Sequence, residues 1–135
     1  IIEKYPIHSC TDVTGFGLAG HGIEMADGSK VTFDIFLDSI PIQTAALEYA
    51  KMGLIPEGAY RNRQFLEKQV DLGQSEVFWQ DIIFDPQTSG GLLISADRET
   101  AEKIVREFAD NNLDTEFGII GQVKERGEKS LSLIG

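Results

Sequence analysis

The chain has 135 residues, enough for one domain, and its 41% hydrophobic and 25% charged residues are typical of an ordinary globular protein. Its 22 acidic residues outnumber its 12 basic residues, so the net charge is −10 and we expect no nucleic-acid partner and no anionic membrane. One cysteine excludes an internal disulfide, and no apolar run approaches the roughly 20 residues that span a bilayer, so we expect a cytoplasmic location. The chain begins without Met, and we expect a domain that belongs to a longer protein.

The first half of the chain contains three periodic segments. Apolar residues at helical spacing predict a buried helix over 16–26, although its glycines at 20 and 22 weaken it unless another segment approaches closely. A turn at Asp27-Gly28 leads into a half-exposed strand over 31–37, where apolar and polar residues alternate. A second helix covers 42–50 and stops at Gly53, and the Pro/Gly-punctuated stretch 54–64 is expected to be a loop.

The second half is less regular. Residues 65–80 favour no single element, although Trp79 is expected to pack in a core or an interface. The remaining predicted elements are strands over 82–84 and 92–94, a helix from the N-cap Asp97 to Asn111, and closing strands over 117–123 and 131–134. Together they predict an α+β fold in which helices cover an antiparallel or mixed sheet.

The stretch 10–22, "CTDVTGFGLAGHG", matches the dinucleotide-binding glycine pattern in form, and Asp38 lies at the distance where an acid would hold a ribose. Two features argue against that interpretation. The residues before Gly15 are mostly polar instead of a buried apolar strand, and the following strand alternates instead of being apolar throughout. We therefore reject a dinucleotide site.

Polar residues precede the same predicted helix. Thr11, Asp12 and Thr14 lie before a glycine-lined helix start, where free N–H groups favour anions. Asp and Thr are also preferred N-caps, so Asp12 or Thr14 could instead serve only as a cap. The sequence leaves both alternatives open.

A second dense stretch, "DPQTSGG", covers 85–91. Gly90-Gly91 permits positive φ or close backbone approach, and Thr88 and Ser89 add hydroxyls. Such a loop can form a nest of N–H groups for phosphate, or a tight turn between two strands. If it binds phosphate, Gly90→Val is expected to lower turnover with little effect on stability.

Four stretches together carry a family resemblance: "TDVTGFGLAGH" (11–21), "EMA" (24–26), "YRN" (60–62) and "FDPQTSGGLL" (84–93). In this order they resemble the carboxy-terminal domain of selenophosphate synthetase (selenide, water dikinase), a family in the aminoimidazole ribonucleotide synthetase superfamily. The resemblance implies an α/β/α sandwich with a mixed, largely antiparallel sheet. It also implies that residues 1–135 form the second domain of an enzyme that converts selenide, ATP and water to selenophosphate, AMP and phosphate.

The resemblance further implies the roles of individual residues. Asp12 is expected to be a ligand of a magnesium ion in an Mg/ATP site at the cleft with the amino-terminal domain, which would carry the reactive Cys or selenocysteine. The candidate phosphate- or substrate-facing residues are Thr11, Thr14, Gly15, Thr88, Ser89, Gly90 and Gly91. We expect no catalytic residue in this chain, no turnover by the isolated chain, a homodimer of the full protein and a monomer of the fragment.

Two alternatives remain at this stage. The chain could belong to the hydrogenase-maturation or thiamine-phosphate kinase branch of the superfamily, although "DPQTSGG" favours the selenium branch. It could also be a non-catalytic regulatory domain with the same fold. Cys10 is expected to be a small buried residue, and His8 and His21 lack the ligand set of a zinc site.

Overall fold

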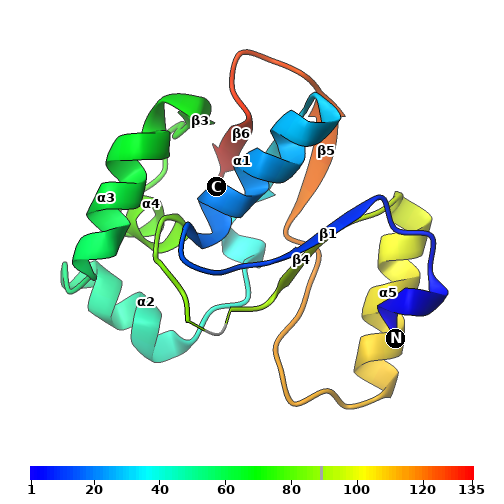
Figure 1. Cartoon of the computed structure of the whole chain (residues 1–135). Helices are drawn as coiled ribbons and strands as arrows, with labels where there is room; N and C mark the ends of the chain where they lie inside the picture. Colours follow the sequence, from blue (N-terminus) through cyan, green and yellow to red (C-terminus); the bar gives the residue numbers. More distant parts are fainter. Residues whose placement is uncertain (89) are drawn as a thin grey trace.

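A computed structural model describes residues 1–88 and 90–135. Helices and strands follow one another along the chain, with a few short 3₁₀ turns between them (Figure 1). The helices are α1 Gly17–Ser29, α2 Thr44–Lys51, α3 Glu57–Leu66, α4 Val77–Ile83 and α5 Arg98–Asp110, with 3₁₀ turns η1 Ile2–Lys4, η2 Leu37–Ser39 and η3 Glu67–Gln69. The strands are β1 Ser9–Asp12, β2 Val31–Phe36, β3 Val70–Asp71, β4 Leu92–Ser95, β5 Gly121–Glu125 and β6 Leu131–Ile134.

The strands form two separate sheets. A four-stranded sheet has the order β3-β6-β2-β5, in which β6 is parallel to both β3 and β2 while β5 is antiparallel to β2. The antiparallel pair β1-β4 forms the second sheet. The predicted mixed α/β architecture is confirmed: among the described residues, β1-β4 and β2-β5 pair antiparallel, and β6 pairs parallel with β2 and β3.

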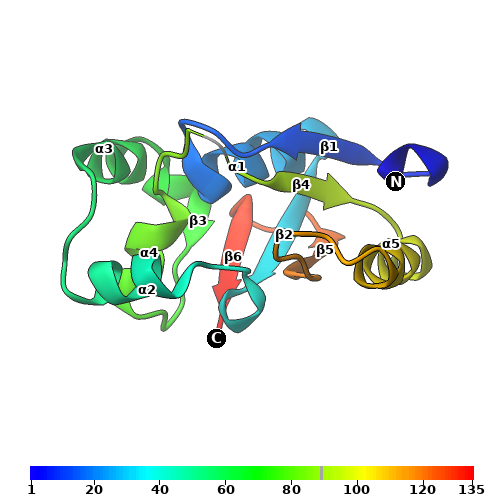
Figure 2. The ribbon, with the colours of Figure 1, turned by 90° about the horizontal axis from the view of Figure 1, so that it is seen from below.

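Helix α1 packs against the four-stranded sheet through its apolar face. Ala19, Ile23 and Ala26 are buried in one core with Phe33 and Ile35 of β2. The predicted close approach to the helix glycines is confirmed in this core, because a Cβ on Gly22 would lie 3.3 Å from Leu131 and one on Gly20 would lie 3.2 Å from Leu66. In Figures 1 and 2, α2, α3 and α4 lie on one side of α1 and the strands, and α5 lies on the other.

Strand β2 is buried on both faces, so the predicted half-exposed strand is wrong. Thr32 is 1% exposed and Asp34 is 7% exposed, although both are polar. The Thr32 hydroxyl donates to the Lys129 carbonyl and accepts from the Gly127 N–H, and the Asp34 carboxylate accepts from Gln122. Burial is tolerated because these groups keep hydrogen-bond partners.

Three further local predictions fail for identifiable reasons. Residues 57–66 form α3 instead of a loop, because Pro56 stands at its N-cap with φ −63°, which suits a helix start. Residues 82–83 end α4 instead of forming a strand, since a short apolar run does not distinguish the two. The helix α1 continues through Asp27-Gly28 and ends before Lys30, which adopts the left-handed conformation.

Other predictions hold. The Asp97 carboxylate caps α5 by accepting from the Thr100 N–H at 2.9 Å, and the helix ends at Asn111. Trp79 is partly buried against the core, as predicted. No helix in the described part of the chain is long and apolar enough to cross a membrane.

Candidate functional site

The two long motifs, about 75 residues apart in sequence, lie side by side in the fold. Strand β1 carries the first motif and pairs in antiparallel register with β4, which carries the end of the second, so that Asp12 lies opposite Leu92 and Cys10 opposite Ile94. A backbone bond from the Val13 N–H to the Gly91 carbonyl continues the pairing beyond the strands. The fold therefore joins the two motifs in one structural unit.

Asp12 lies at the exposed end of β1 and does not cap a helix. The exposed residues of β1 are Cys10 and Asp12, which alternate with the half-buried Ser9 and Thr11. The N-cap of α1 is Phe16, and no side chain makes a capping hydrogen bond there. The capping alternative is therefore wrong for Asp12, and the expectation that Cys10 is buried is wrong as well, because its side chain is exposed.

Thr14 contacts His21 instead of capping the helix. The Thr14 Oγ1 atom lies 3.0 Å from Nε2 of His21, whose side chain is buried at 8% exposure, one helical turn into α1. The Nδ1 atom of His21 faces Glu24 at 3.5 Å from Oε2. One hydrogen bond therefore joins the Thr14 hydroxyl to the His21 ring, while Nδ1 of His21 has no hydrogen-bond partner among the described residues.

The glycines of the two motifs fall into two groups. Gly17, with φ +72°, and Gly90 are in close backbone contact: a Cβ on Gly17 would lie 2.9 Å from the carbonyl oxygens of Ile83 and Asp85, and one on Gly90 only 2.0 Å from that of Val13. Gly15 and Gly91, in contrast, have open space where a Cβ would stand, as far as the described residues show. Close backbone approach therefore explains Gly90, and from this contact we expect Gly90→Val to lower stability, contrary to the expectation from the sequence.

The remaining motif residues differ in position. Thr11 is half-buried, and its hydroxyl donates to the backbone carbonyl of Asp12, not to the carboxylate. Thr88 is exposed, and Ser89 lies outside the described residues. The loop 84–91 follows helix α4, so it is not a turn between two strands.

Asn62 was not among the predicted site residues, although it stands in the "YRN" motif. It lies on α3, and its Nδ2 atom donates to the carbonyl oxygens of Gly15 and Phe84, at 2.9 Å each. A further backbone bond joins the Gln87 N–H to the Thr14 carbonyl. The sequence predicted a loop over 54–64. It did not indicate that Asn62 lies on a helix, from which its side chain reaches both motifs.

Asp85, the first residue of "DPQTSGG", is a second acidic group that the site assignment missed. Its side chain is half-buried, and burial raises the pKa of its carboxyl above the ordinary value. Burial likewise raises the pKa of Asp81, and the nearby Arg63 guanidinium, 3.6 Å away, partly offsets this.

No group of three His, Cys, Asp or Glu side chains within 1–88 and 90–135 is arranged to hold a metal ion. Asp12 is therefore one exposed carboxylate and not a complete site. Magnesium is usually held by one or two carboxylates together with phosphate oxygens and water. The Asp12 carboxylate therefore fits one ligand position of such a site, with the other ligands coming from outside this chain.

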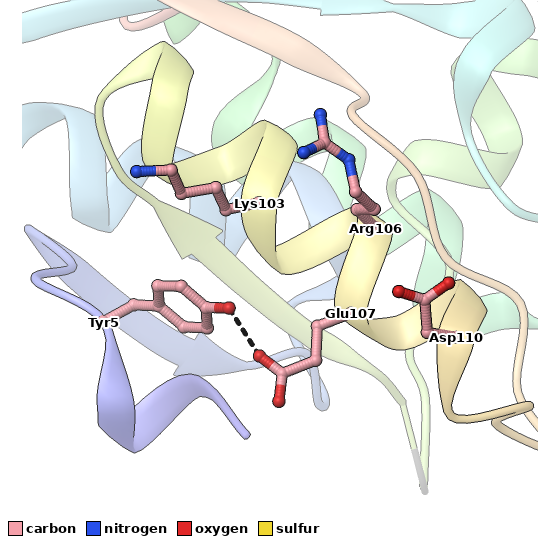
Figure 3. A pocket seen from close by; sticks show the side chains of 5 residues that line it. All are labelled: Tyr5, Lys103, Arg106, Glu107 and Asp110. Carbon is pink, nitrogen blue, oxygen red and sulfur yellow. Dashed lines mark hydrogen bonds between the residues drawn. The ribbon is translucent and has the colours of Figure 1, made fainter.

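Two surface hollows lie away from the motifs. The first, of about 250 Å³, is lined by side chains of the N-terminal segment and α5: Tyr5, Lys103, Arg106, Glu107 and Asp110 (Figure 3). In it the Tyr5 hydroxyl donates to the Glu107 carboxylate, which also pairs with Lys4. The second hollow, of about 430 Å³, lies over the polar residues of the four-stranded sheet, including Thr32 and Ser132. Neither is lined by a predicted site residue.

Comparison with known proteins relates the chain to a group of enzymes. It is 50% identical over 126 residues to a selenide, water dikinase of Clostridium botulinum (strain Eklund 17B / Type B), covering 93% of this chain and 36% of that protein. It is 47% identical over 133 residues to a selenide, water dikinase of Clostridioides difficile (strain 630), covering 98% of this chain and 38% of that protein. The chain thus spans little more than a third of the length of these relatives.

The fold has a solved counterpart as well. A thiamine-monophosphate kinase from Stenotrophomonas maltophilia K279a superposes with a TM-score of 0.60 at 19% identity, covering 98% of this chain and 32% of that chain. At this identity the likeness concerns the fold alone. The sequence matches the family described as AIR synthase related protein, C-terminal domain, over residues 1–134. The chain belongs to this family.

Proposed function

We propose that this chain is the carboxy-terminal domain of a two-domain selenide, water dikinase, which converts selenide, ATP and water to selenophosphate, AMP and phosphate. The similarity to enzymes of that name at 47–50% identity, over nearly the whole chain, supports the proposal. The larger part of each relative lies outside the matched region, which leaves room for an amino-terminal domain that binds ATP. The thiamine-phosphate kinase alternative is not favoured, because that likeness is limited to the fold.

The exposed carboxylate of Asp12 is the observation that carries the proposal. It stands at the end of β1, on the same face of the two-stranded sheet as Leu92, and no residue of the described structure engages it in a hydrogen bond or an ion pair. A carboxylate left free beside two closely packed motifs is suited to a ligand from outside the domain. Asp12 would contribute one oxygen ligand to a magnesium ion shared with aspartates of the amino-terminal domain.

Magnesium bound there would neutralise charge on the phosphoryl groups during transfer. The chain's own residues would position the phosphates around it. Gly15 and Gly91 leave open space where backbone can approach a ligand, and Thr88 is an exposed hydroxyl that can donate to a phosphate oxygen.

The proposed two-domain site implies the binding partners of this chain. The chain would bind its own amino-terminal domain, with ATP and selenide at the cleft between them, and the full protein would form a homodimer. The isolated fragment is expected to be inactive, because one carboxylate does not make a metal site. It is expected to be monomeric, because the family resemblance implies that the main dimer contact lies in the amino-terminal domain. A cytoplasmic location agrees with the exposed, unpaired Cys10.

The test is a product analysis of the full-length protein that contains this chain. Incubation with ATP, selenide and magnesium should give selenophosphate, AMP and phosphate in equal amounts, measured by ³¹P NMR. Asp12→Asn should abolish most of this product, whereas Asp38→Asn, which changes an exposed acid on η2, should not. Formation of ADP without selenophosphate by the wild-type protein would refute the proposed function.

A further inference from the structure

The side chain of Asn62 connects the two motifs, although it belongs to neither. It is half-buried on α3, and its single Nδ2 atom donates to the Gly15 carbonyl and to the Phe84 carbonyl, both at 2.9 Å. An amide NH₂ group has two hydrogens, and here both are used. One carbonyl precedes α1 and the other follows α4, so one side chain holds the ends of two helices.

The two carbonyl oxygens share this donor. Both lie 2.9 Å from the same nitrogen, so their negative ends converge on one point. They cannot simply move apart, because the start of α1 is packed tightly on the end of α4: a Cβ on Gly17 would lie 2.9 Å from the carbonyl oxygens of Ile83 and Asp85. Without Asn62 the part-buried Phe84 carbonyl would lose this donor, which is unfavourable, whereas the exposed Gly15 carbonyl can be hydrated.

The other links between the motifs are of a different kind. The bonds from the Gln87 N–H to the Thr14 carbonyl and from the Val13 N–H to the Gly91 carbonyl join backbone groups only. They do not depend on side-chain identity. Among the described residues, Asn62 supplies the side-chain hydrogen bonds that fix loop 13–17 relative to loop 84–87.

We propose that Asn62 is a positioning residue for the Mg/ATP site, which sets the distance between the Asp12 strand and the "DPQTSGG" loop. This inference rests on the proposed function, in which Asp12 and that loop act on the same ligand. Positioning by Asn62 is indirect, because it binds backbone carbonyls and leaves Asp12 free. Loss of the Asn62 side chain should therefore lower the affinity for magnesium more than it lowers the stability of the fold.

The test compares variants in the full-length protein. Asn62→Ala removes both donors, and Asn62→Asp keeps the size of the side chain but places acceptors against two carbonyls. We expect kcat/KM for ATP to fall about tenfold or more in both, and more in Asn62→Asp, because Asp12 and the "DPQTSGG" loop are no longer held at a fixed separation around the ligand. Without turnover, titration calorimetry with magnesium and a non-hydrolysable ATP analogue should show weaker magnesium binding. The magnesium concentration for half-maximal activity should rise as well, while KM for selenide stays unchanged. Gln64→Ala, which removes an exposed amide from the same helix, should match the wild type.

Several results would overturn the inference. Asn62→Asp with wild-type activity would show that only side-chain volume matters at this position. An unchanged magnesium requirement in a folded Asn62→Ala would leave Asn62 a purely structural residue. If Asn62→Ala fails to fold, Asn62→Ser gives the same comparison. Failure of the proposed function is distinct, because then the wild-type protein and Gln64→Ala would make no selenophosphate either.

Discussion

Gly90 and Gly91 are adjacent glycines for which the structure predicts opposite effects of the same substitution. A Cβ added at Gly90 would stand 2.0 Å from the Val13 carbonyl oxygen and 2.9 Å from Oε1 of Gln87. The first contact is with backbone, so it cannot be relieved by a rotamer change. At Gly91 nothing that the structure describes lies within 4 Å of the added atom.

The magnitude follows from the geometry. Real Cβ atoms essentially never come closer than 3.0 Å, so the two backbones must separate by at least 3.0 minus 2.0, or 1.0 Å. The bond from the Val13 N–H to the Gly91 carbonyl, now 2.9 Å, would then approach 3.9 Å and be lost. Overpacking costs about 1–3 kcal/mol and the hydrogen bond about 1 kcal/mol, so Gly90→Ala should destabilise by about 2–4 kcal/mol.

Thermal and urea unfolding of the 135-residue chain measures this difference. For a domain of this size, the loss corresponds to a Tm decrease of about 10 °C for Gly90→Ala. Gly91→Ala is the matched control and should change the Tm by less than about 2 °C. Equal Tm values for the two variants would refute the argument that Gly90 is required by backbone contact with Val13.

Two further predictions concern buried polar groups. Thr14→Val removes the hydroxyl that is hydrogen-bonded to Nε2 of His21 and should lower the free energy of unfolding in urea by about 1–3 kcal/mol, whereas Thr14→Ser should retain most of the stability. Equal losses in both variants would exclude the hydrogen bond as the cause. Burial opposes ionisation of Asp34, but hydrogen bonds from Lys124 and Gln122 outweigh it and hold its pKa below the usual value of about 3.9. Its contribution to stability is therefore present above about pH 4 and lost as the pH falls through the lower, folded-state pKa. A Tm profile between about pH 2 and 6 should be flatter for Asp34→Asn, and an unchanged profile would contradict this assignment.

Features that depend only on residues close together in the sequence could be predicted. The apolar spacing of α1 and the Asp97 cap of α5 each depend on neighbouring residues, and the structure confirms both. Strand β2 could not be read in the same way, because its polar residues are buried by partners from β5 and the turn that follows it, about 90 residues further along the chain. Tertiary contacts of this kind override local alternation.

In the candidate site, too, local motifs could be predicted from the sequence and tertiary contacts could not. The motifs around Asp12 and Gly90 were evident from residue types, and their pairing in β1 and β4 agrees with one site. Close backbone approach at Gly90-Gly91 was one of the alternatives stated from the sequence, but the sequence does not reveal that the Val13 carbonyl is the group that lies against Gly90. Asn62 was missed because Pro56 and Gly58 resemble loop residues, although Pro56 precedes α3 and Gly58 packs against Pro86.

The most direct test of the proposed role of this domain is the magnesium dependence of Asp12→Asn in the full-length protein. Asp12 is exposed and engages no described side chain, so the substitution should leave the Tm nearly unchanged. It removes the charge of one metal ligand, and we expect selenophosphate formation at limiting magnesium to fall by about 100-fold, with partial recovery at high magnesium. Wild-type turnover by Asp12→Asn at limiting magnesium would contradict the account, because Asp12 would then be a surface residue without a role in metal binding.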